Sequence, residues 1–250
     1  MSGKTIRLKR IFREDGRAVI SALDFGGFMG PVPGLEVPSD IVQKVVRGGA
    51  DAVIVNPGFA REAHGAYGAK AGLIMRITGG ASRFSPDGSW HVPICSVEEA
   101  VRLGADAVCI MVIMGAPQEH AMLANLGRTA EEAARLGIPV VAELLPSFEH
   151  SYEPEWVGVC ARLGFELGAD VIKTYYCGEG FADVVKSCPI PIVMAGGPKS
   201  TDIFTNIQRA LEAGAAGVAI GRNIFQSPDP EEYTRRIVQL VHGSQEVPTE

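Results

Sequence analysis

Four segments of the chain repeat one pattern, in which a helical stretch ends in glycine and a continuous apolar run follows two residues later. Glycine is the usual residue just beyond a helix, where the backbone turns left-handed. Apolar runs without polar alternation indicate strands buried on both faces, as in a parallel sheet covered by helices. The four units are Gly49-Ala50-Asp51 before residues 52–55, Gly104-Ala105-Asp106 before 107–110, Gly168-Ala169-Asp170 before 171–173, and Gly214-Ala215-Ala216 before 217–220.

Further apolar runs of the same length bring the number of expected strands to eight. They cover residues 18–23, 72–77, 138–145 and 190–195. Helical periodicity fills most of the gaps, at residues 40–47, 119–135, 155–167, 181–186, 201–212 and 231–241. Alternating strands and helices predict an α/β protein with a parallel sheet.

The chain length favours a closed barrel over an open sheet. Eight units in 250 residues leave about 31 residues each, the size of one βα repeat. A doubly wound open sheet would usually carry a GxGxxG turn after its first strand, and Asp24-Phe25-Gly26-Gly27 is different. We therefore predict a single (βα)8 TIM-barrel domain over residues 1–250, with residues 1–16 as an N-terminal capping segment. The weakly helical connections 58–70 and 81–96 are expected to be loops at the rim of the site.

Charge and composition exclude several classes of protein. The formal net charge is −6, which argues against nucleic acid as the main partner. The only dense basic stretch lies in the first 13 residues, and we expect it to pack on the domain; its members are Lys4, Arg7, Lys9, Arg10 and Arg13. No apolar run is long enough to span a bilayer. The five cysteines form no CxxC pair, which favours a reducing, cytoplasmic environment.

Polar side chains end most of the predicted strands, where TIM barrels carry their chemistry. Lys173 is the clearest candidate among them, because the charge of an ammonium group within a strand buried on both faces must be compensated. A desolvated lysine can form a Schiff base with a carbonyl substrate, although a structural ion pair with Asp24 or Glu143 is the alternative. We expect Asp24, Glu143 and Tyr175 to act with Lys173, since Glu143 and Tyr175 share the inward parity of their strands.

Glycine-rich turns follow the seventh and eighth predicted strands. In eight-stranded barrels these two turns commonly bind a phosphate group through backbone N–H groups and a nearby cation. The expected phosphate-binding residues are Gly196, Gly197, Lys199, Gly221 and Arg222. The five histidines show no HxH or HxxxH spacing, so we expect no catalytic metal and no other cofactor.

These motifs together resemble the DeoC/FbaB family of class I, Schiff-base-forming aldolases, from about residue 20 to residue 241. The motifs most similar within that family belong to the thiolases that act on 3-hydroxy-5-phosphonooxypentane-2,4-dione and to archaeal-type fructose-bisphosphate aldolases. The resemblance rests on Asp24-Phe25-Gly26 with Gly30-Pro31 and Gly34-Leu35, on residues 171–174, on Ala195-Gly196-Gly197-Pro198-Lys199, and on residues 221–226.

The resemblance implies a Schiff base on Lys173, a phosphorylated substrate and a homo-oligomer, which in this family is often a ring. Two positions differ from the family pattern, since Leu145 replaces a tyrosine acid and Phe25 replaces a histidine. Proton transfer is then expected from Asp24, Glu143, Tyr175 or water. Our leading hypothesis is an aldolase-type lyase. The alternatives are an acyltransferase with coenzyme A as co-substrate and a phosphosugar-binding barrel without turnover.

Overall fold

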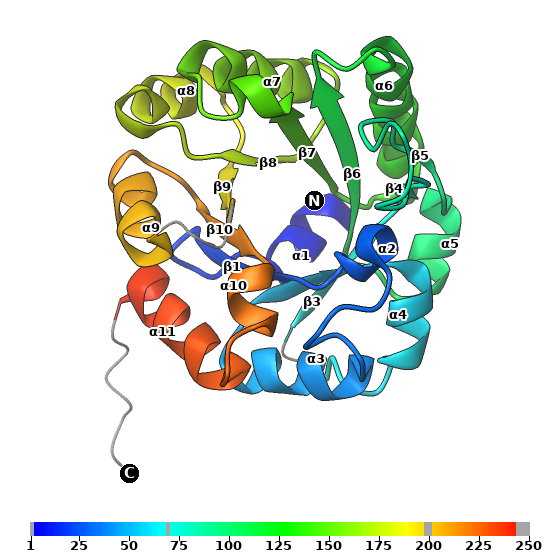
Figure 1. Ribbon diagram of the computed structural model, residues 1–250, viewed down its shortest axis with the longest axis vertical. Coiled ribbons are helices and arrows are strands. Elements are labelled where there is room, and N and C mark those ends of the chain that lie inside the picture. The colour runs from blue at the N-terminus through cyan, green and yellow to red at the C-terminus, as the bar shows by residue number, and fades with distance from the viewer. Residues whose placement is uncertain (1–2, 69–70, 198–201, 244–250) are drawn as a thin grey trace.

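The eight apolar runs form the strands of a closed parallel barrel in the computed structural model, which describes residues 3–68, 71–197 and 202–243. Around the barrel the order is β1-β10-β9-β8-β7-β6-β3-β2, and helices surround it on the outside (Figure 1). The predicted TIM barrel is therefore confirmed. The strands are β1 (Ala18–Ala22), β2 (Ala52–Val55), β3 (Gly72–Arg76), β6 (Ala107–Met114), β7 (Val140–Pro146), β8 (Val171–Tyr175), β9 (Ile192–Ala195) and β10 (Gly217–Ile220).

The six helices expected from periodicity are present, with ends that differ from the prediction by no more than two residues. They are α3 (Pro38–Arg47), α6 (Glu119–Leu136), α7 (Pro154–Glu166), α8 (Phe181–Ser187), α9 (Ile203–Glu212) and α11 (Pro230–His242). The repeat glycines Gly49, Gly104, Gly168 and Gly214 all have φ between 86° and 98°. Gly49, Gly168 and Gly214 follow α3, α7 and α9, and Gly104 follows a short helix at Val97–Arg102; the left-handed backbone at these positions is the reason for glycine there.

Several short elements lie outside the predicted set. The expectation of a loop at residues 58–70 was wrong at its start, because α4 (Pro57–Glu62) begins with a proline at its first turn. Residues 81–96 are largely irregular, but β5 (Val92–Pro93) pairs antiparallel with β4 (Thr78–Gly79). The remaining short helices are α1 (Gly3–Leu8), α2 (Gly26–Met29), α5 (Val97–Arg102) and α10 (Arg222–Phe225), with 3₁₀ turns at Phe148–His150 and Gly178–Gly180.

Alternate residues of each strand fill the barrel, and the others pack against the helices. The interior is lined by Ile20, Ile54, Ile74, Val141 and Val171 among others, and Ile11 of the N-terminal segment closes it from one end. Buried on both faces, the strands carry the two-sided apolar character seen in the sequence. The same parity directs Arg76, Glu143 and Lys173 into the barrel, each two residues beyond an interior apolar residue of its strand, Ile74, Val141 and Val171 respectively.

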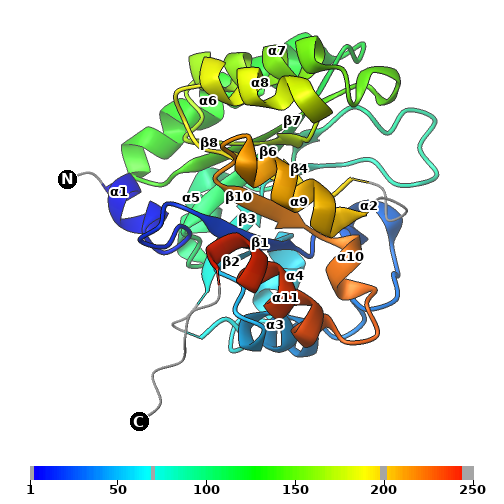
Figure 2. The same ribbon diagram turned by 90° about the vertical axis from the view of Figure 1, so that its left-hand side faces the viewer.

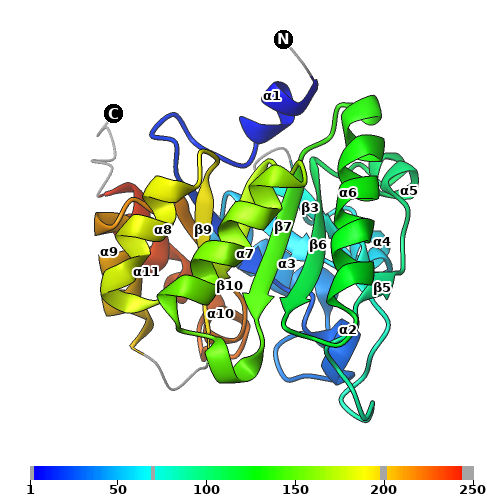
Figure 3. The same cartoon turned by 90° about the horizontal axis from the view of Figure 1, so that it is seen from above.

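The N-terminal segment covers the end of the barrel where the strands begin. Figures 2 and 3 show α1 at this end, with α2 and α10 at the opposite one. Three aspartates of the repeat each form an ion pair with a basic residue of this segment. The pairs are Lys4 Nζ–Asp170 Oδ2 (2.7 Å), Arg10 Nη1–Asp106 Oδ1 (2.8 Å) and Arg13 Nε–Asp51 Oδ1 (2.5 Å).

The three repeat aspartates also fasten the neighbouring strand. Asp51, Asp106 and Asp170 each accept a backbone N–H from the strand beside their own, donated by Val19 (2.7 Å), Leu73 (3.1 Å) and Val140 (2.8 Å). The fourth repeat has Ala216 at this place, and no cation is needed there. The aspartates of the repeat are therefore structural groups at the face opposite the predicted site.

Candidate active site

A cavity of about 370 Å³ opens at the carboxyl ends of the barrel strands, the end that carries α2 and α10 in Figure 2. Every barrel strand contributes to its wall, either directly or through the residues that follow it. Of the two connections predicted at the rim, residues 81–96 contribute Ala81, His91 and Ile94, whereas the described part of 58–70 contributes none. The cavity is therefore where the sequence analysis placed the site.

Lys173 and Glu143 form an ion pair on the floor of this cavity. The two residues are directly opposite each other in the β7–β8 register, and Lys173 Nζ lies 2.8 Å from Glu143 Oε1. Both side chains are only 6% exposed. Asp24 and Glu143 were the two ion-pair partners considered for Lys173 from the sequence, and in the structure the partner is Glu143.

Arg76 extends this pair into a row of four charges. Its Nε donates to Asp24 Oδ2 at 2.7 Å, and its Nη2 donates to Glu143 Oε2. The order Asp24–Arg76–Glu143–Lys173 thus alternates in sign, and its two carboxylates balance its two cations. Balanced, hydrogen-bonded charges can remain ionised although they are buried.

The charge row sets the protonation of Glu143. Burial by itself would raise the pKa of this carboxyl, but the neighbouring cations Lys173 and Arg76 outweigh it and lower the pKa to about 2. Glu143 is consequently a carboxylate at neutral pH in the unliganded protein. It can take a proton when Lys173 gives one up, because the guanidinium of Arg76 stays charged.

Tyr175 also lies in the cavity, two residues beyond Lys173 on β8. Burial raises the pKa of its hydroxyl to about 12, with Glu143 adding to the effect. Its ring lies against Tyr152, with 5.4 Å between the ring centroids. At neutral pH the hydroxyl of Tyr175 keeps its proton, so it can donate a hydrogen bond to a substrate oxygen.

The two predicted phosphate turns meet on one side of the cavity. Gly196, Gly197, Gly221 and Arg222 all line it, and Arg222 Nη2 donates to the carbonyl of Gly197 at 3.1 Å. The guanidinium of Arg222 also stacks over Phe25, 5.2 Å from its ring centroid. No ion pair of Arg222 occurs within the described ranges, so its charge is available to an anion. Lys199 lies outside the described residues.

Arg76 is one of the polar residues that end the predicted strands, but no role was predicted for it or for His91. The inward position of Arg76 could have been found from parity, because Gly72, Ile74 and Arg76 occupy one face of β3 and the first two face the interior. His91 gave no such signal, since it lies in the irregular stretch between β4 and β5. The positions noted for their departure from the family pattern, Leu145 and Phe25, both line the cavity.

Neither a metal cluster nor a membrane-spanning helix is found in the part of the chain that the structure describes. No three His, Cys, Asp or Glu side chains gather there as a metal site. The longest described helix, α6, has 18 residues, and none of the described helices is long and apolar enough to cross a bilayer.

Comparison with known proteins gives matches over nearly the whole chain. A family profile described as DeoC/LacD family aldolase matches residues 18–227. The chain is 37% identical over 246 residues to 2-amino-3,7-dideoxy-D-threo-hept-6-ulosonate synthase 1 of Archaeoglobus fulgidus, covering 98% of this chain and 93% of that one. It is 30% identical over 250 residues to 2-amino-4,5-dihydroxy-6-oxo-7-(phosphonooxy)heptanoate synthase of Streptomyces griseus, covering 96% and 91%.

A solved structure matches to the same extent. An archaeal fructose-1,6-bisphosphate aldolase, with its catalytic lysine covalently bound to the carbinolamine intermediate of its substrate, superposes with a TM-score of 0.87. The two chains are 33% identical, and the match covers 96% of this chain and all of that one.

Proposed function

The chain belongs to the DeoC/LacD family of aldolases, and from this membership we propose that it makes or breaks a carbon–carbon bond next to a phosphorylated ketone through a Schiff base on Lys173. The observation that carries the proposal is the Lys173–Glu143 ion pair, which lies in the same cavity as the glycine turns and Arg222. Lysine is the only residue type in this cavity that forms a Schiff base with a ketone.

Glu143 is placed to move the protons that this reaction needs. Lys173 must lose one proton before Nζ can attack the ketone, and Glu143 Oε1 at 2.8 Å can take it. The attack forms a carbinolamine. Glu143 then gives its proton to the carbinolamine hydroxyl, which leaves as water, so the positive charge returns to the iminium nitrogen and the negative charge to Glu143.

The turns after β9 and β10 are proposed to hold the phosphate of the substrate. Backbone N–H groups at glycine can approach phosphate oxygens closely, and the guanidinium of Arg222 matches their geometry. In the Streptomyces relative the named compound is a 6-oxo-7-(phosphonooxy) acid, in which the ketone is one carbon from the phosphate ester. Lys173 and Arg222 line the same cavity, as a substrate that carries both groups requires.

The acyltransferase alternative is not favoured. The matched relatives are aldolase-type synthases and an aldolase. The binding barrel without turnover is likewise disfavoured by the intact Lys173–Glu143 pair. The homo-oligomer, the cytoplasmic location and the lack of a nucleic-acid partner stay predictions from the sequence.

Borohydride trapping tests the proposal. The protein is incubated with dihydroxyacetone phosphate and sodium borohydride, and peptide mass spectrometry locates the reduced adduct, which we expect on Lys173. Lys173→Met should abolish the adduct, while Lys186→Met, at an exposed lysine of α8, should leave it unchanged. Condensation of the same ketone with glycolaldehyde, glyceraldehyde, glyceraldehyde 3-phosphate and aspartate semialdehyde then identifies the accepted aldehyde. Absence of any adduct would refute the proposal.

A further inference from the structure

Cleavage of an aldol needs a base that is separate from the Schiff-base chemistry. When the bond between the iminium fragment and the alcohol carbon breaks, the hydroxyl of that carbon must lose its proton to become an aldehyde. This inference rests on the proposed function, under which a side chain of the cavity must take this proton.

The charged groups already assigned are poorly suited to this step. At this stage the iminium has restored a positive charge beside Glu143, so the carboxylate again lies between two cations and is a weak base. Asp24 is held by Arg76. Tyr175 carries its proton at neutral pH, so it can donate a hydrogen bond but cannot accept the proton.

His91 lies on the wall of the cavity opposite the phosphate turns. The chain segment that carries it returns to β3 through the pairing of β4 with β5, and β3 is diametrically opposite β9 in the barrel order. A substrate anchored by its phosphate at β9 and β10, with its ketone at Lys173 on β8, therefore extends its remaining carbons toward this wall. His91 lines the cavity there.

The backbone of His91 is held in place, although its ring atom Nδ1 makes no hydrogen bond in the described structure. Its backbone N–H contacts the sulfur of Met122 on α6 at 3.4 Å, and the same loop is tied to α2 by a hydrogen bond from Arg83 N to Phe28 O at 3.0 Å. The ring atom Nδ1 is buried and has no hydrogen-bond partner in the described structure. A buried polar atom without a partner is costly and is a common mark of a functional group.

We propose that His91 is the base of the carbon–carbon step, which accepts the hydroxyl proton as the aldehyde forms. The electrons of the broken bond move to the iminium nitrogen and leave an enamine, while the proton passes from the alcohol oxygen to a ring nitrogen of His91. The imidazolium releases this proton to water, and the enamine carbon takes up a proton before the Schiff base is hydrolysed. In the condensation direction His91 is the acid.

The charges around His91 are consistent with a base. Burial lowers its pKa below the ordinary 6.5, and the positive charge of Arg76 lowers it further, against smaller opposite effects of Glu143 and Asp24. The imidazole is therefore neutral at pH 7 and can accept a proton.

Three variants test the assignment. His91→Gln should form the reduced adduct with dihydroxyacetone phosphate as the wild type does, yet lose at least about 100-fold in kcat for condensation with the accepted aldehyde. His120→Gln, at an exposed histidine of α6, should leave both measurements unchanged. His91→Ala should be rescued by added imidazole, because the small base can occupy the vacated space.

The pH profile separates a proton-transfer role from a structural one. Wild-type kcat/KM for cleavage should fall on the acid side with an apparent pKa below 6.5, and His91→Gln should lack this limb. A His91→Gln enzyme within about threefold of the wild type would overturn the assignment, and so would loss of the adduct in that variant. Absence of the adduct in the wild type would refute the proposed function itself.

Discussion

Replacing Arg76 by Met should show how much the row of four charges contributes to the free energy of unfolding. The substitution keeps an unbranched apolar side chain but removes the cation between Asp24 and Glu143. The Arg76 and Glu143 side chains are 5% and 6% exposed and that of Asp24 is 14% exposed, so water cannot fully solvate the carboxylates. Removing one partner of a buried ion pair costs about 3–5 kcal/mol of unfolding free energy.

Thermal unfolding at pH 7.5 measures this cost. For a domain of this size 1 kcal/mol corresponds to roughly 2–4 °C, so Arg76→Met should lower Tm by about 6–20 °C. Arg76→Met with Asp24→Asn should recover part of the stability, since the unpaired charge is then gone.

A surface ion pair of similar geometry serves as the control. Arg61 Nη2 lies 2.7 Å from Glu99 Oε1, but the Arg61 side chain is 53% exposed. Arg61→Met should therefore change the free energy of unfolding by less than about 1 kcal/mol. If Arg76→Met cost no more than this control, the row would contribute little to stability, and the reasoning from burial would be refuted.

Three further outcomes are expected. Arg222→Ala should raise KM for the phosphorylated ketone about 10- to 100-fold and weaken inhibition by inorganic phosphate, because a charged hydrogen bond is worth about 1.5–3 kcal/mol; an unchanged KM would contradict the phosphate assignment. Burial opposes protonation of His242, but hydrogen bonds to Asp51 and Asp15 raise its pKa above 6.5, so the Tm advantage of the wild type over His242→Gln should be full below pH 6.5 and fade as the pH rises through that raised pKa. A difference in Tm that is equal at pH 6 and pH 9 would argue against an imidazolium there. Gly217→Ala should prevent soluble expression, because the φ of Gly217 is +121° and a Cβ there would lie 2.0 Å from the carbonyl oxygen of Ala18. The control Gly104→Ala, at a φ of +86° with open space around it, should lower the free energy of unfolding by only about 1–2 kcal/mol. Soluble, stable Gly217→Ala protein would count against this steric argument.

The barrel could be predicted because burial on both faces gives every strand a continuous apolar run in the sequence. Short helices give a weaker sequence pattern. Val97–Arg102 has only six residues and no room for a periodic face, although Ser96 accepts from the N–H of Glu99 at 3.0 Å. The sequence Ser96-Val97-Glu98-Glu99 is a capping-box pattern, so this helix could have been found from its start rather than from its periodicity.

The candidate site could be predicted only where strands carry it. Lys173, Glu143 and Tyr175 follow from strand parity, and the glycine turns follow from strand count. The pairing of Lys173 with Glu143 rather than Asp24 depends on the register of two strands, which the apolar pattern leaves open. His91 depends on the path of an irregular loop, and loop paths are set by tertiary contacts such as the one from Arg83 to Phe28.

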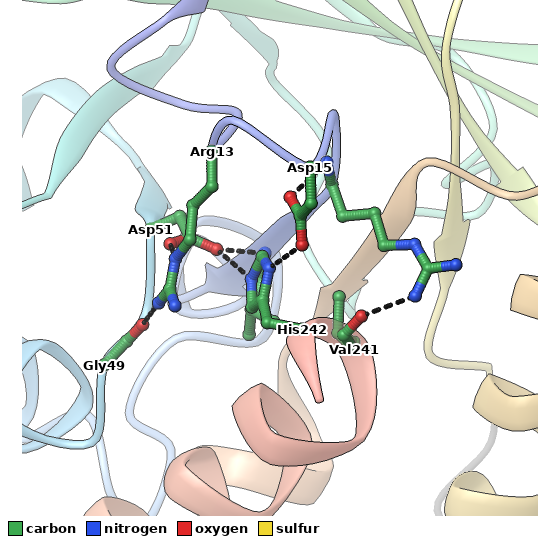
Figure 4. A network of polar contacts seen from close by, with 8 residues as sticks. Arg13, Asp15, Gly49, Asp51, Val241 and His242 are labelled. Carbon is green, nitrogen blue, oxygen red and sulfur yellow. Dashed lines mark hydrogen bonds and ion pairs between the residues drawn. The ribbon is translucent and has the colours of Figure 1, made fainter. Parts of the chain in front are cut away.

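The ionic contacts of the N-terminal segment bear on the order in which the chain assembles. The segment is synthesised before the barrel strands, yet its partners are spread along the sequence, up to 166 residues away for Lys4 and Asp170. His242 contacts Asp15 across 227 residues at 2.7 Å and contacts Asp51 at 2.9 Å, so it connects α11 with the N-terminal segment (Figure 4). Contacts of such sequence separation form late because long loops must close first.

The three ion pairs of the segment therefore become possible at different stages of synthesis. Arg13 can meet Asp51 once 38 further residues have been made, whereas Lys4 has to wait for Asp170, 166 residues further along the chain. Complete docking of residues 4–13, and with it the closing of the barrel by Ile11, therefore requires that the chain has been made at least as far as the start of β8.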